Sequence, residues 1–165
     1  MINFALAKRV DIVFLVGRWN IYCHESNFES DLHRTITKLS DAHIRVVIIR
    51  DIAEFRYGNP TLQLAMAANL GRDVTRVGVP FADHVRAGKR CNAIFDRLTG
   101  GNVSVFDPAT AFVDKTGLWR AEYGGASMYI DAHHLSVAGS LRLQSLFEAL
   151  FDRLLSPAEQ REDAP

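Results

Sequence analysis

The sequence predicts an α/β domain in which a mainly parallel β-sheet is covered by helices on both faces. Apolar, β-branched runs of strand length alternate with amphipathic stretches of helical length. The runs contain no polar alternation, which is typical of parallel strands buried on both faces. With 165 residues, 48% of them hydrophobic, the chain is long enough for one ordinary core. We expect a single domain over residues 1–156 and a polar tail over 157–165.

The elements follow in chain order. Strands are predicted at residues 10–17 (VDIVFLVG), 44–52 (IRVVIIRDI) and 103–108 (VSVFDP), with a last extended piece at 127–130 (SMYI). Apolar residues at helical spacing predict helices at 25–42, 61–70 and 81–98. A closing helix, capped by Ser136, is predicted over 137–155. Functional residues of such sheets gather where the strands end.

Charge and cysteine content exclude some classes of function. Lys+Arg and Asp+Glu balance at 19 each, so we expect no nucleic-acid partner and no overall attraction to an anionic surface. No apolar run reaches the length of a membrane helix, and the first residues lack the pattern of a signal peptide, so composition assigns no location. Cys23 and Cys91 match no metal-ligand spacing. Two buried thiols are the expectation, and one disulfide in an oxidising compartment is the alternative.

Asp131, His133 and His134 lie in the stretch MYIDAHHLSVAGS, between the last extended piece and the closing helix. An ionised aspartate can orient a histidine, fix its tautomer and stabilise the imidazolium that forms when the histidine takes a proton. The alternative is an Asx-type turn in which Asp131 and the histidines only close the junction. No metal site is expected, because the spacing is no recognised ligand pattern.

The segment YIDAHHLSVAG resembles the D-x-x-H-L-S-x-x-G signature of SGNH-type domains, in the form fused to membrane-embedded acyltransferase family 3 domains that O-acetylate bacterial polysaccharides. The segments DIVFLVGRWNIY, VVIIRDIAEF and VFDPATAFVDKTG resemble other parts of these domains in the same order. The resemblance implies a flavodoxin-like three-layer fold. It also implies that His134 is a general base and that Asp131 orients it, with no metal or organic cofactor.

The nucleophile of the family has no counterpart in this sequence. No G-D-S block is present, so the resemblance implies a C-terminal portion that lacks the first strand–helix units and is inactive alone. Where the family's oxyanion-stabilising G-x-N-D block falls, this chain has GRWN, which makes Arg18, Trp19 and Asn20 candidates for the substrate or oxyanion region. The missing units are expected to expose the edge of the 10–17 strand and to favour self-association.

Two functions remain open at this point. The first is one part of an O-acyltransferase or acetylesterase whose substrate is an acylated carbohydrate and whose partner is a membrane acyltransferase domain. The second is a non-catalytic glycan-binding or assembly domain with a surface formed by Arg18, Trp19, Tyr22 and Trp119. The resembling domains are extracytoplasmic, which favours that location for this chain.

Overall fold

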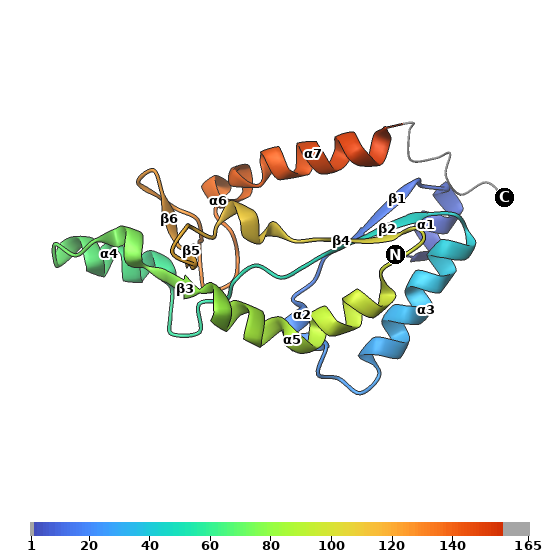
Figure 1. The fold of residues 1–165 in the computed structure, drawn as a ribbon, viewed down its shortest axis with the longest axis horizontal. Helices are drawn as coiled ribbons and strands as arrows, with labels where there is room; N and C mark the ends of the chain where they lie inside the picture. Colours follow the sequence, from blue (N-terminus) through green and yellow to red (C-terminus); the bar gives the residue numbers. More distant parts are fainter. Residues whose placement is uncertain (1, 157–165) are drawn as a thin grey trace. The chain divides into compact units, whose positions relative to one another are not determined.

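The computed structural model describes residues 2–156 and divides into two compact units (Figure 1). The first comprises Met1–Glu54 and Val79–Trp119, and the second Phe55–Gly78 and Arg120–Pro165. The tail predicted at 157–165 lies outside the described residues.

A three-stranded parallel sheet forms the centre of the first unit, in the order β1 (Ile12–Leu15), β2 (Arg45–Ile49) and β4 (Val103–Phe106). These strands confirm the predicted mixed α/β class. In β2, Val46 and Ile48 belong to the hydrophobic core on one face, and Val47, which points to the other face, is 1% exposed. Both faces of β2 are therefore buried, as its uninterrupted apolar run predicts. β1 is less buried along its whole length.

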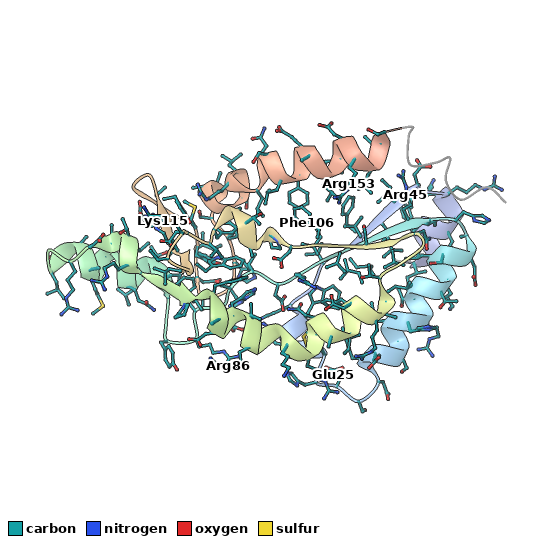
Figure 2. All side chains as sticks on the ribbon, viewed as in Figure 1. Glu25, Arg45, Arg86, Phe106, Lys115 and Arg153 are labelled. Carbon is teal, nitrogen blue, oxygen red and sulfur yellow. A yellow bond between two sulfur atoms is a disulfide. The ribbon has the colours of Figure 1, made fainter. Side chains whose placement is uncertain are left out.

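Helices α1 (Ile2–Lys8), α3 (Phe28–Asp41) and α5 (Phe81–Leu98) supply the rest of this core. α3 contributes Leu32, Ile36 and Leu39 at helical spacing, so the periodicity that predicts this helix also identifies its buried face. α5 turns polar residues to solvent on its other side, where Arg86 donates to Asp83 one turn earlier (Figure 2). The predicted helix at 81–98 is confirmed at both ends.

Cys23 and Cys91 form a disulfide, so the expectation of two buried thiols is wrong. Cys23 follows the short helix α2 (Trp19–Tyr22), which packs against α5, the helix that carries Cys91. This packing brings their Cα atoms to 5.5 Å, within the range that a disulfide spans. The sequence could not show this pairing, because 68 residues separate the two cysteines.

The second unit contains α4 (Pro60–Asn69), the short 3-10 helix η1 (Val74–Arg76), the hairpin strands β6 (Glu122–Tyr123) and β7 (Ala126–Ser127), α6 (Val137–Arg142) and α7 (Gln144–Leu155). Strands β3 (Gly78–Pro80) and β5 (Leu118–Arg120) carry the chain across the boundaries of the two units, and the 3-10 helix η2 (Pro108–Ala111) follows β4. The end of α4 matches its prediction, since Gly71 adopts a positive φ of 62° just beyond it.

The single closing helix predicted over 137–155 is divided into α6 and α7, which is a second correction. The break falls at Leu143, whose N–H donates to Ser140 O at 3.1 Å, a bond of the tighter 3-10 type. Gly139 and Ser140 lie just before it, and such small residues are a common site of helix kinks. Within residues 2–156, no helix combines the length and apolar character needed to cross a bilayer.

Candidate acid–base site

Asp131 lies at the centre of the site, and its two carboxylate oxygens accept hydrogen bonds from different groups. Oδ1 accepts the backbone N–H groups of His133 at 2.9 Å and His134 at 2.8 Å, which makes an Asx-type turn. Oδ2 lies 2.7 Å from Nδ1 of His134. The turn and the Asp–His contact, which the sequence left as alternatives, are therefore both made by one side chain.

The pairing fixes the chemical state of both residues. The bond to His134, followed by the backbone N–H of His133, holds the pKa of the Asp131 carboxyl well below its usual range. An ionised carboxylate can only accept, so Nδ1 of His134 carries the hydrogen, and in the neutral imidazole Nε2 is then the nitrogen with the lone pair. The His134 side chain is 62% exposed. The His134 ring is therefore oriented by Asp131 and accessible from solvent.

Backbone bonds close the turn that holds this pair. Tyr129 and Leu135 form an antiparallel β-bridge across it, and the N–H of Ile130 donates to the carbonyl of His134 at 3.0 Å. The five residues between the bridge partners, which include Asp131 and His134, are therefore closed into a short loop by backbone bonds. These backbone bonds therefore hold the turn from which the His134 side chain projects.

Ser136 is the N-cap of α6, as the sequence predicts, and its hydroxyl is fully engaged. Oγ donates to Ser127 O at 2.6 Å and accepts the N–H of Gly139 at 3.1 Å. A Cβ on Gly139 would lie 2.1 Å from the carbonyl oxygen of Met128, so no larger residue fits there without a backbone shift. The L-S-x-x-G part of the signature therefore packs the closing helix directly against the chain that leads into Asp131.

Two further residues support the turn from a distant part of the sequence. The hydroxyl of Thr61 donates to Tyr129 O at 2.9 Å, and the N–H of Phe55 donates to Ala132 O at 2.8 Å. The Phe55 and Tyr129 rings meet edge to face, with centroids 4.9 Å apart. Sequence reasoning missed both residues, because Thr61 and Tyr129 are 68 positions apart and no motif links them.

His133 lies against the pair. Its ring centroid is 4.2 Å from that of His134, and its Nδ1 is 3.7 Å from Asp131 Oδ1. Donor atoms of Asp131, His133 and His134 all lie within 4.8 Å of one another, so these three residues are where a cation would find ligands among residues 2–156. A cation bound to Asp131 would compete with His134 for the carboxylate, so metal binding and the orientation of His134 by Asp131 oppose each other.

The segment with Arg18, Trp19 and Asn20 belongs to the first unit and is held by Asp51. The Asp51 carboxylate accepts the backbone N–H of Trp19 at 3.0 Å and of Asn20 at 2.8 Å. Burial raises the pKa of Asp51, and the two N–H bonds act in the opposite direction. The strand-end rule includes Asp51, at the end of the clearest strand of the chain, but the sequence assigned it no role.

These contacts narrow what the 18–20 segment can offer a substrate. The Trp19 side chain belongs to the core, where its indole N–H donates to Ile49 O at 2.7 Å. The Asn20 side-chain oxygen packs 3.6 Å from Cys91 Sγ, which has no hydrogen to donate because it is in the disulfide. Arg18 pairs with Glu54, and its side chain is 39% exposed. Of the three residues, Arg18 is the one whose charged group meets solvent.

The structure is a mixed α/β domain in which Asp131 pairs with His134 inside the stretch that resembles the SGNH signature. The family model described as "SGNH domain (fused to AT3 domains)" matches residues 1–149, and the chain belongs to this family. Comparison with curated proteins found no match.

Among solved structures, the fold is similar to that of the periplasmic domain of a lipopolysaccharide acetyltransferase from Salmonella ser. Paratyphi A, with a TM-score of 0.67 and 14% identity. The similarity covers 91% of this chain and 60% of that one, so the chain spans less than two thirds of its structural neighbour.

Proposed function

We propose that this domain supplies the general base and its orienting acid to an acyl-transfer site that acts on carbohydrate. The observation that carries the proposal is the 2.7 Å pairing of Asp131 Oδ2 with His134 Nδ1, which leaves Nε2 of an exposed histidine free. The pair also lies in the stretch that resembles the D-x-x-H-L-S-x-x-G signature, within the residues that the family model matches.

In the proposed reaction, Nε2 of His134 takes the proton of a serine hydroxyl while the serine oxygen attacks the carbonyl carbon of an acyl donor. Asp131 stabilises the imidazolium through Nδ1–H. The proton then passes to the leaving group, and an acyl-serine remains. A sugar hydroxyl, or water, gives its proton to His134 as it attacks the acyl-serine, and the serine leaves with that proton.

We propose that the serine comes from residues outside this sequence, in the same protein or in a partner. No G-D-S block occurs in the 165 residues, and the hydroxyl of Ser136 is engaged as a helix cap. A base and its acid without a nucleophile should not turn over an ester. Incubation of this chain with an O-acetylated sugar, an unactivated ester that imidazole alone does not readily cleave, should therefore show no turnover that depends on His134.

The tautomer of His134 tests the role of Asp131 on this chain alone. Nitrogen-15 NMR at pH 8 should show Nδ1 protonated and Nε2 bare, and the Asp131→Asn variant should lose this preference, because an amide can no longer act only as an acceptor. The His133→Ala variant is the matched control and should keep it. Protonation of Nε2 in the unmodified chain would contradict the proposal.

A membrane acyltransferase domain as partner and an extracytoplasmic location complete the proposal. The family description, which names fusion to AT3 domains, supports the partner. The Cys23–Cys91 disulfide supports an oxidising compartment, and the structural neighbour is a periplasmic domain.

A non-catalytic glycan-binding domain is the competing proposal. Of the four residues that the sequence offers for a glycan-binding surface, the structure leaves fewer exposed. Trp19 is 8% exposed and Trp119 is fully buried, so neither ring is available to stack on a sugar. Arg18 and Tyr22 remain partly exposed. Under this proposal, replacing Arg18 would weaken polysaccharide binding while replacing His134 would leave both binding and acylation unchanged.

A further inference from the structure

Helix α4 is apolar on two sides although only one of them is buried. Its sequence, PTLQLAMAAN, has no charged residue. Leu64 is buried, whereas Leu62, Met66 and Leu70 follow one another at steps of four residues and are 60%, 56% and 58% exposed. These three large apolar side chains lie on one exposed face and contribute little to the core. A contiguous exposed apolar patch usually marks a contact surface.

The exposed face borders a hollow of about 560 Å³. Met66, Ala67 and Leu70 from α4 and Val77 from the following segment give the hollow an apolar surface. The remaining lining residues are polar or charged: Gln63, Arg72, Asp73 and Arg76. An apolar surface with cationic side chains beside it fits a ligand that is itself both apolar and anionic.

The charged side chains that line the hollow, Arg72, Arg76 and Asp73, sum to one positive charge. Arg72 and Arg76 are both exposed, and neither forms a salt bridge among the described residues. The Asp73 carboxylate is held by the N–H and the hydroxyl of Thr75, at 2.9 and 2.6 Å. Arg76 acts electrostatically on the Asp73 carboxylate, and the two exposed guanidinium groups together leave the lining with an excess positive charge.

We propose that this α4 face, formed by Leu62, Met66, Leu70, Arg72 and Arg76, binds the surface of an anionic lipid bilayer. The apolar side chains would enter the boundary between headgroups and acyl chains, and the arginines would bind lipid phosphates. Tyr57, 97% exposed just before α4, is a residue type that favours this interface. The proposal goes beyond acyl transfer and does not depend on Asp131 or His134.

The charges favour a lipid surface over a second copy of the chain. A two-fold dimer through the α4 face would bring like-charged Arg72 and Arg76 of both copies together, which is unfavourable. The family description also names fusion to AT3 domains. Because these acyltransferase domains are embedded in the membrane, a bilayer would lie near this domain. A balanced overall charge of 19 basic and 19 acidic residues does not oppose this, because the attraction is local.

Co-sedimentation with lipid vesicles tests the proposal on the oxidised chain. The chain should bind vesicles of equimolar phosphatidylcholine and phosphatidylglycerol, and bind vesicles of phosphatidylcholine alone far more weakly. Leu62→Ser/Met66→Ser and Arg72→Gln/Arg76→Gln should each lower the partition coefficient about tenfold or more. Added salt should weaken binding of the unmodified chain and have little effect on the arginine variant.

Two matched controls remove equivalent groups elsewhere. Val137→Ser/Leu141→Ser changes an exposed apolar pair at the same spacing on α6, and Lys89→Gln/Arg90→Gln removes two exposed charges on α5. Both should bind like the unmodified chain, and circular dichroism should show that all variants are folded. Absence of binding to the anionic vesicles, or equal losses in the controls, would overturn the proposal. So would a dimer in size-exclusion chromatography that Leu62→Ser/Met66→Ser abolishes, because the α4 face would then bind a second copy.

Discussion

Removal of the Cys23–Cys91 disulfide should cost the first unit a large share of its stability. The bond joins α2 to α5 and closes a loop of 68 residues. Restricting a loop of that length in the unfolded chain stabilises the fold by about 4 kcal/mol on the chain-entropy model. Because both cysteines are buried, alanine fills their positions without placing a new polar group in the core. The Cys23→Ala/Cys91→Ala variant should therefore lower the midpoint of thermal unfolding by about 10 °C or more.

Urea unfolding followed by tryptophan fluorescence measures this loss, because Trp19 lies in the same core and accepts the N–H of Cys23 at 2.8 Å through its carbonyl. Dithiothreitol should destabilise the unmodified chain by a similar amount and leave the alanine variant unchanged. Thiol titration in denaturant should find no free thiol before reduction. Two free thiols in protein exported to an oxidising compartment, or a loss below about 1 kcal/mol, would refute the reasoning.

Three further predictions concern the site and the sheet edge. Gly139→Ala should lower the free energy of unfolding by about 2 kcal/mol, because the new Cβ meets the Met128 carbonyl, whereas Ser140→Ala at the exposed next position should not. The Asp131 carboxyl, followed by carbon-13 NMR, should titrate well below its usual pKa; the stability it gives should be present above the unfolded value and be lost as the pH falls toward the folded one. His134→Ala should raise the pKa of Asp131, and an unchanged titration would contradict the pairing. The chain should also self-associate in size-exclusion chromatography, since β1 pairs only with β2 within residues 2–156; a monodisperse monomer at all concentrations would count against this.

The sequence predicted the elements that depend on local pattern. The apolar run at 44–52 identified β2 and its burial on both faces, and the spacing of Leu32, Ile36 and Leu39 identified the buried side of α3. The cap at Ser136 was also recognisable, because its side-chain bond joins residues only three positions apart. Each of these features is encoded within one or two turns of chain.

Features that join distant residues were missed or misjudged. The disulfide, the support of Tyr129 by Thr61, and the bonds from Asp51 to Trp19 and Asn20 all cross 30 or more positions. Trp19 illustrates the consequence: an exposed aromatic at a strand end and a buried one look alike in sequence, and its burial depends on Phe28 and Phe95, which pack against its ring. The site role of Asp131 and His134 was predicted through family resemblance, whereas the turn chemistry alone left it open.

Acyl transfer measured in membranes that hold this chain together with the membrane acyltransferase domain proposed as its partner tests the central claim most directly. Acetate released by mild base from the polysaccharide product reports the rate. We predict that His134→Ala lowers it about a thousandfold, that Asp131→Asn lowers it strongly as well, and that His133→Ala leaves it within the same order of magnitude. Unchanged acylation by the His134→Ala protein, with polysaccharide binding intact, would contradict the assignment of His134 as the general base.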